Sequence, residues 1–259
     1  MEDAGRRANT GEQLVRAFAA QTGAEVYMTL RRGETLLLTV GIPVVFLLFF
    51  STVHVVSTPH QKAVDFFVPG ILALAIMSTA MVSLGIATGF ERGYGVLKRL
   101  GATPLGRPRL LGAKIATVAL VEILQTAVLV AVGFALGWNP FGHGSGGASF
   151  GAVGAALLAT IAFGGIGLFM AGVLKAEVNL AAANGLYLVL LLLGGMVVPI
   201  SKLPGGVAAV AKLLPADALS AGLHNAFGTG SAVPTLSWVV LAVWAMAAPV
   251  GAALSFRWE

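Results

Sequence analysis

One short stretch of this sequence has the spacing of a serine nucleophile. Residues 147–151 read G-A-S-F-G, a G-x-S-x-G pattern in which the Ser149 hydroxyl could attack a carbonyl once a histidine removes its proton. A histidine base is hard to find. The apolar stretch 233–256 contains none, and His224 lies in the segment before it. The surrounding loop is rich in Gly and Ser, where such a pattern arises easily by chance, so Ser149 is a weak candidate.

The sequence supports nucleotide binding or metal binding even less than it supports a serine nucleophile. No G-x-x-x-x-G-K-[ST] is present, and residues 101–107 have its glycine spacing but continue with Arg and Pro. The chain has no H-E-x-x-H, and its 4 histidines are scattered. We therefore expect no metal and no cofactor on this chain.

A carboxylate lies near the middle of an apolar stretch at Glu122. A charge at that depth costs roughly 2.5–3.5 kcal/mol, so the group must be paired, protonated or facing water. Gln125 and Thr126 lie on the same helix face. We expect the three to hydrogen-bond to a neighbouring helix, with Asn179 or Asn184 as partners. The alternative is that Glu122 faces a transport pathway and attracts cations.

Two methionines, Met77 and Met81, stand four residues apart in another apolar stretch. A soft methionine surface can adapt to varied ligands, which makes the pair a second pathway candidate. Ordinary helix packing explains the same spacing.

The polar segment 91–104 is the most informative region between the apolar stretches. It contains Glu91, Arg92, Gly93, Leu97, Lys98, Arg99, Leu100, Thr103 and Pro104. The pattern predicts a short helix over 91–100 that ends before Pro104. Leu97 and Leu100 would share a face of this helix, as docking into a partner's groove requires. A basic loop without a partner is the alternative.

Six long apolar stretches must position these side chains. Hydrophobic residues make up 57% of the chain and charged residues only 10%, against about 25% charged in soluble domains. Each stretch is close to the ~20 residues that cross a bilayer core. They cover 35–56, 64–88, 110–136, 149–174, 178–200 and 233–256. The sequence predicts an all-α membrane protein with six transmembrane helices.

The basic residues predict the orientation of these helices. Threading the stretches alternately leaves Lys62, Lys202 and Lys212 on one side and the other 13 of the 16 Lys and Arg residues on the opposite side. Because positive residues stay in the cytoplasm, both termini are predicted to be cytoplasmic. The formal charge of +5 thus reflects membrane orientation, and nucleic acid is not an expected partner.

The segments outside the six stretches complete the domain organisation. Residues 1–34 form a cytoplasmic leader with an amphipathic helix at the interface, and 35–259 form one membrane domain. Segment 201–232, broken by Pro204 and Pro215, predicts short helices that re-enter the outer leaflet between the fifth and sixth spans. Small residues crowd the fourth and fifth spans and indicate either packing within one bundle or contact with a second copy.

Several of these segments together resemble one transporter family. Residues 91–93, 97–100 and 103–104 resemble the coupling segment of ABC-2 type transporter permeases. Residues 194–200, followed by Leu203-Pro204 and Leu214-Pro215, look like the same family's exit from the fifth span and its outer helices. The drug and antibiotic exporters of the daunorubicin-resistance kind are similar in size.

The resemblance implies a function and a set of partners. It implies the permease subunit of an ATP-driven exporter of an amphipathic drug, antibiotic or lipid-like substrate. Two copies of an ABC ATP-binding subunit would carry the ATP and Mg, and a second permease, identical or homologous, would complete the assembly. The location would be a bacterial inner membrane, with a multi-pass chain in the lipid bilayer. The remaining alternative is a rhomboid-like intramembrane serine protease that uses Ser149, although such enzymes place their histidine in the sixth span.

Overall fold

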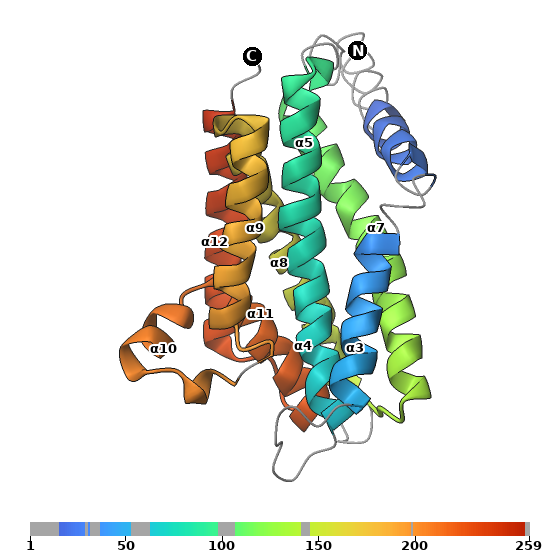
Figure 1. The fold of residues 1–259 in the computed structure, drawn as a ribbon, viewed down its shortest axis with the longest axis vertical. Helices are drawn as coiled ribbons and strands as arrows, with labels where there is room; N and C mark the ends of the chain where they lie inside the picture. The colour runs from blue at the N-terminus through green and yellow to red at the C-terminus, as the bar shows by residue number, and fades with distance from the viewer. Residues whose placement is uncertain are drawn as a thin grey trace, which may run out of the picture.

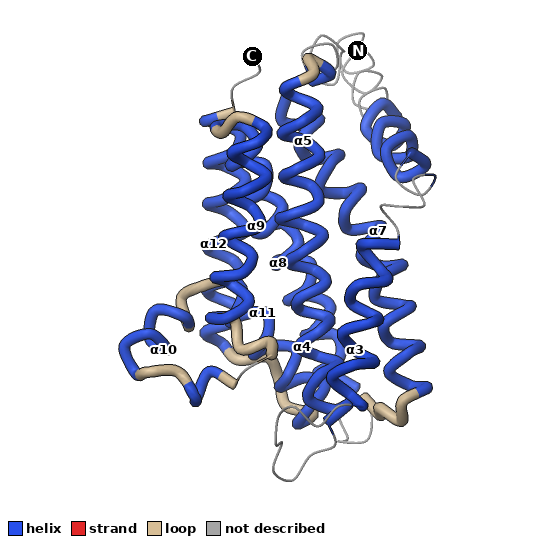
Figure 2. The backbone as a smooth tube through the Cα atoms, in the orientation of Figure 1, coloured by secondary structure: helices blue, strands red, loops and turns tan. Residues whose placement is uncertain are grey.

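A computed structural model describes residues 16–28, Arg31, 37–52, 63–97, 107–140, 146–197 and 199–256. Every regular element within these ranges is helical, as the backbone tube shows (Figure 2). The helices run side by side in an elongated bundle (Figure 1). The all-α class predicted from the sequence is confirmed.

Among the described residues, five helices are long and apolar enough to cross a membrane. The first of them joins α4 (Ala63–Met77), the π-helical segment η2 (Ser78–Ser83) and α5 (Leu84–Gly93) into 31 residues. The others are α7 (Arg107–Ala135), α8 (Gly146–Val173), α9 (Ala176–Leu193) and α12 (Thr235–Ser255). They correspond to the second to sixth predicted stretches.

Two of these helices differ from the predicted bounds. The helix predicted over 64–88 continues to Gly93, so that it carries the start of the polar segment 91–104. The helix predicted over 178–200 stops at Leu193, because Gly194 caps it and Gly195 takes φ +64°, a left-handed conformation that suits glycine.

The first predicted stretch, 35–56, is shorter in the described residues. It consists of the π-helical segment η1 (Leu37–Gly41) and α3 (Ile42–Thr52), which packs against α4. The apolar helix Thr39–Thr52 is shorter than the helices that qualify as spans, and residues 53–56 lie outside the described part.

Helix α8 is the centre of the bundle and packs most extensively against α12. Glycines allow this close approach. A Cβ on Gly154 would lie 2.7 Å from the Trp238 ring, and one on Gly165 would lie 2.5 Å from the backbone nitrogen of Pro249. The small residues of the fourth span therefore serve packing within the chain, which was the first of the two interpretations of this pattern.

The segment between α9 and α12 folds into short helices. α10 (Gly205–Ala211) is followed by α11 (Pro215–His224) and the π-helical η4 (Asn225–Thr229), and the two arms meet at 89°. This bent pair is either a broken span or a re-entrant loop, as the prolines in the sequence predicted. His224 connects it to α4, because its Nε2 lies 3.1 Å from the carbonyl oxygen of Phe66.

Candidate functional site

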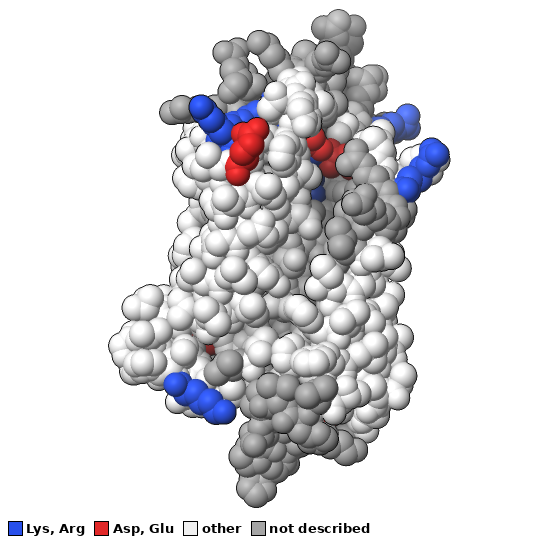
Figure 3. Space-filling model, in the orientation of Figure 1, with Lys and Arg blue, Asp and Glu red and all other residues white. Residues whose placement is uncertain are grey.

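The predicted coupling segment begins at one end of the bundle, where α5 ends and α7 begins. We call this the basic end; its described cations include Arg92, Arg109, Lys114 and Lys175. In Figure 3, Lys and Arg gather mainly at the end where α5 finishes, and another cation lies near α10 at the opposite end.

The predicted helix over 91–100 is wrong in its boundaries. Glu91, Arg92 and Gly93 form the last turn of α5, and Tyr94 and Gly95 make a turn in which Gly95 has φ +71°. Helical backbone resumes at Val96 and Leu97. A left-handed residue interrupts a right-handed helix, so the segment is a helix end, a turn and a new helical start. Lys98, Arg99, Leu100, Thr103 and Pro104 lie outside the described residues.

Arg92 connects α5 to the end of α8. Its two terminal nitrogens donate hydrogen bonds to the carbonyl oxygens of Gly172 and Leu174. These carbonyls lie at the C-terminus of α8, where they lack helical partners and where the helix dipole favours a cation. Arg92 therefore acts as a capping residue within the chain, a role that the sequence analysis missed.

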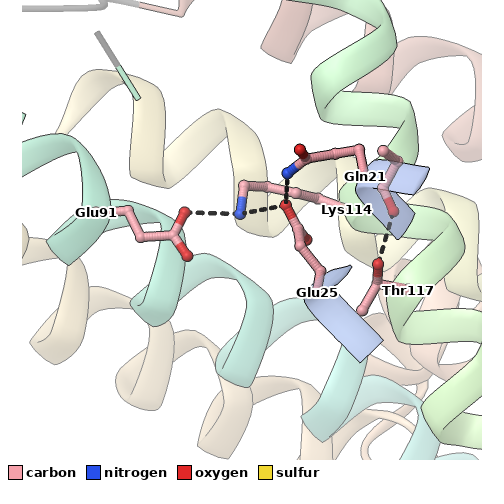
Figure 4. Close-up of polar contacts among 6 residues, drawn as sticks. Gln21, Glu25, Glu91, Lys114 and Thr117 are labelled. Atoms are coloured by element: carbon pink, nitrogen blue, oxygen red, sulfur yellow. Dashed lines mark hydrogen bonds and ion pairs between the residues drawn. The ribbon is translucent and has the colours of Figure 1, made fainter. Parts of the chain in front are cut away.

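Lys114 lies between two carboxylates from different elements (Figure 4). Its Nζ is 2.6 Å from Glu91 of α5 and 3.3 Å from Glu25 of the N-terminal helix at 16–28. The lysine side chain is only 4% exposed, and Gln21 donates a 2.9 Å hydrogen bond to Glu25. The Glu25–Lys114–Glu91 cluster thus joins the N-terminal helix, α5 and α7.

Sequence reasoning did not bring these three residues together. The signal was present, because Lys114 lies within the apolar stretch 110–136 and Glu25 interrupts the apolar side of the leader helix. A buried ammonium needs a partner, so a lysine inside an apolar stretch predicts a nearby acid. The partner's identity depends on tertiary packing.

Leu97, one of the two leucines predicted to contact a partner, is buried. Its side chain is 0% exposed and belongs to the hydrophobic core, so in this conformation it offers no surface to a partner. Tyr94, in the preceding turn, is 76% exposed. The predicted docking of Leu97 into a partner's groove would therefore require this side chain to leave the core.

The polar residues near the middle of the bundle form hydrogen bonds, but not with the helix that we expected. Thr160 of α8 donates to a carboxylate oxygen of Glu122 and also lies 3.0 Å from its own helix carbonyl, Ala156. Gln125 accepts a 3.1 Å hydrogen bond from Thr79 of η2 and donates a 2.6 Å bond to the carbonyl of Thr39. α7 is therefore bonded to α8, η2 and η1.

The fifth span does not supply these bonds, which corrects the expected partners. Asn179 is buried and donates to the carbonyl of Gly85, 2.8 Å away. Asn184 is exposed and bonds to the carbonyl of Leu180 in its own helix at 2.8 Å. Neither asparagine is therefore bonded to Glu122.

The two pathway methionines are fully buried. Met77 and Met81 are each 0% exposed, and a Cβ on Gly167 of α8 would lie 2.5 Å from the Met81 carbonyl. In this conformation their side chains pack against the core and border no open surface.

Ser149 and His224 do not form a nucleophile and base. Ser149 lies in the first turns of α8. Both ring nitrogens of His224 are engaged elsewhere: Nδ1 lies 2.8 Å from the carbonyl of Ser220, and Nε2 contacts that of Phe66. The serine chemistry considered for residues 147–151 therefore has no base from this histidine.

Comparison with known proteins identifies relatives of this chain. The profile of the "ABC-2 type transporter" family matches residues 16–227, most of the chain. A similar protein is the "Putative transport permease YvfS" of Bacillus subtilis (strain 168), which is 26% identical over 215 residues. The aligned region covers 82% of this chain and 85% of that protein.

Proposed function

The chain belongs to the ABC-2 type transporter family, and from this premise we propose that it is the permease of an ATP-driven exporter for amphipathic drugs, antibiotics or lipid-like molecules. The family match covers residues 16–227, so the chain is a multi-pass permease of this family. The apolar interior of the described bundle suits an amphipathic cargo better than a polysaccharide.

The basic end is the proposed site of energy transfer. ATP and Mg would bind to two ABC ATP-binding subunits, which would press on the segment 91–104 as they close. Movement of the end of α5 would reach α8 through Arg92, and α7 and the N-terminal helix through Lys114. ATP can drive transport only if its binding favours one permease conformation over the other, and these bonds give the elements that would move together.

The second permease would pack against α9. Only 22% of the apolar window of this helix is buried, against 56% in α8. Ala181, Asn184, Gly185 and Leu188 lie on its outer side, and a Cβ on Gly185 would meet nothing within 4 Å. Small residues on an open face allow two helices to approach closely. The small residues of the fifth span thus support the contact with a second copy.

The observation that carries the proposal is the position of the polar segment 91–104, which begins at the end of a membrane helix that is bonded to α8 and α7. We would reconstitute the permease with an ABC ATP-binding subunit in inverted vesicles and measure ATP-dependent uptake of daunorubicin and of an NBD-labelled phospholipid. We expect uptake of at least one probe that requires hydrolysable ATP. ATP hydrolysis that is coupled to import, or to neither probe, would contradict the export of amphipathic molecules.

A further inference from the structure

An apolar groove lies on the outside of the bundle between α7 and α12, with α8 as its floor. It has a volume of about 240 Å³ and is lined by Leu111, Gly112 and Ile115 of α7, Leu168 of α8, and Pro249 and Ala253 of α12. None of these residues has a charged or hydrogen-bonding side chain. The groove is separate from the mid-bundle polar residues and from the Glu25–Lys114–Glu91 cluster.

The packing of three helices creates this groove. Both flanking helices touch α8, because a Cβ on Gly164 would lie 3.1 Å from Ile115 of α7 and one on Gly165 would lie 2.5 Å from Pro249 of α12. Between these two contacts the walls carry small side chains, notably Gly112 and Ala253. Small residues in the walls therefore leave a slot where larger ones would have closed it.

The position of the groove identifies what surrounds it. α7, α8 and α12 are all candidate membrane spans, so their outer surfaces face hydrocarbon. The lining residues lie within the first turns of α7 and the last turns of α12, at the depth of one leaflet next to the basic end. Water would find no polar partners there, and an empty slot would forfeit dispersion contacts.

A basic residue one turn before the groove favours a phospholipid. Arg109 precedes Gly112 by three residues on α7 and is exposed. A lipid whose chain entered the groove would place its phosphate at this level, where cations attract it.

We propose that this groove is a binding site for one acyl chain of a membrane phospholipid, retained in the leaflet at the basic end. The bound lipid would fill the space between α7 and α12 and hold their ends at a fixed separation. The inference rests on the chain spanning a membrane and is independent of which molecule is exported.

The test is photo-crosslinking with a defined lipid. The full-length permease is reconstituted in vesicles of phosphatidylethanolamine and phosphatidylglycerol that contain a phosphatidylglycerol with a diazirine in one acyl chain. After irradiation, mass spectrometry compares crosslinks at 111–115 and 249–253 with those at Val239, Val243 and Met246, which are exposed on the same helix α12. We expect enrichment in the groove by about tenfold, the factor gained from burying two methylene groups.

Variants separate a site from ordinary surrounding lipid. Ala253→Phe fills the groove and should lower its crosslinks to the level of the reference surface, whereas Val243→Phe, an equivalent change on the exposed face, should leave them unchanged. Equal labelling of groove and reference surface in the unmodified protein would refute the site, even if the filled variant failed to fold. Disulfide-linked dimers of Ala253→Cys in the cysteine-free chain would show a second copy at the groove and would also overturn the proposal.

Discussion

At the residue level, Lys114 links three elements with one buried charge. Two carboxylates approach it, and each comes from a segment distant in sequence. Removing one partner of a buried ion pair is more harmful than replacing the whole pair, because it leaves an uncompensated charge. The cluster therefore couples the N-terminal helix to α5 only while its lysine is present.

We predict that Lys114→Met destabilises the protein by roughly 1–3 kcal/mol, since Glu25 and Glu91 are left facing each other. The loss of stability should be smaller than for a fully buried ion pair, because the Glu91 side chain is 35% exposed. Thermal unfolding in detergent measures the loss. The triple variant Glu25→Gln, Glu91→Gln, Lys114→Met should recover much of it, and no recovery would mean that Lys114 contributes packing rather than charge.

The mid-bundle polar residues allow a matched comparison. Gln125→Leu leaves the hydroxyl of Thr79 and the carbonyl of Thr39 without this partner, so we expect a loss of about 1–3 kcal/mol. Glu122→Leu should cost less, because the Thr160 hydroxyl can donate instead to the carbonyl of Ala156. Unfolding in detergent again gives the measurement. A larger loss for Glu122→Leu than for Gln125→Leu would contradict this assignment.

The sequence predicted that Glu122 and Gln125 would need partners, but it did not predict which ones. Depth in an apolar stretch is enough to show that a carboxyl must be satisfied. The choice of Thr160 and Thr79 depends on how helices are rotated and ordered around α7, and six apolar helices of similar composition contain little information about that order. For the same reason the outward orientation of Asn184 was missed.

At the level of elements, the number and position of the long helices could be predicted, whereas their ends could not. Apolar length sets a span, so five of the predicted stretches recur as long apolar helices. The ends depend on local backbone conformation: Gly95 and Gly195 take positive φ and terminate or interrupt helices that composition alone would continue. The π-helical segment η2 also has no clear signal in the sequence.

Two substitutions near the end of α5 should distinguish a residue that packs in the core from one that contacts a partner. Leu97→Asp places a charge in the core, so we expect a loss of roughly 3 kcal/mol or more and poor expression. Tyr94→Asp changes an exposed residue in the adjacent turn and should leave stability within about 0.5 kcal/mol while weakening co-purification with the ATP-binding subunit. If Tyr94→Asp co-purifies normally and transport is unchanged, this turn is not part of the contact.

Two glycines test the assignment of helix faces. Gly165→Ala places its Cβ against the backbone of Pro249, which cannot move aside easily, so we expect a loss of about 1–3 kcal/mol. Gly185→Ala meets nothing within the chain and should be neutral or stabilising by up to ~1 kcal/mol. Unfolding curves give both values. If α9 contacts a second permease, Gly185→Ala should also weaken the dimer in size-exclusion chromatography, whereas an unchanged dimer would place the contact elsewhere.

At the level of the whole molecule, the two ends of the bundle differ in what they can contact. The basic end carries the residues that connect α5, α7, α8 and the N-terminal helix, and the opposite end carries the bent pair α10–α11. An ATP-driven permease needs such polarity, because ATP is available on only one side of the membrane. The proposed mechanism therefore depends on which side the basic end faces.

Labelling of single cysteines can determine this orientation, since the natural chain contains none. We expect Thr10→Cys and Gly101→Cys to react only after the membrane is permeabilised, and Ser145→Cys and Ser231→Cys to react with an impermeant maleimide on intact cells. The physical reason is the split of 13 basic residues against 3, because lysine and arginine are retained in the cytoplasm during insertion. The reverse labelling pattern would put the end of α5 outside the cell. No ATP-binding subunit could then reach Tyr94, Arg92 or the cluster around Lys114, and the proposed coupling through α5 would have to be abandoned even though the family assignment would stand.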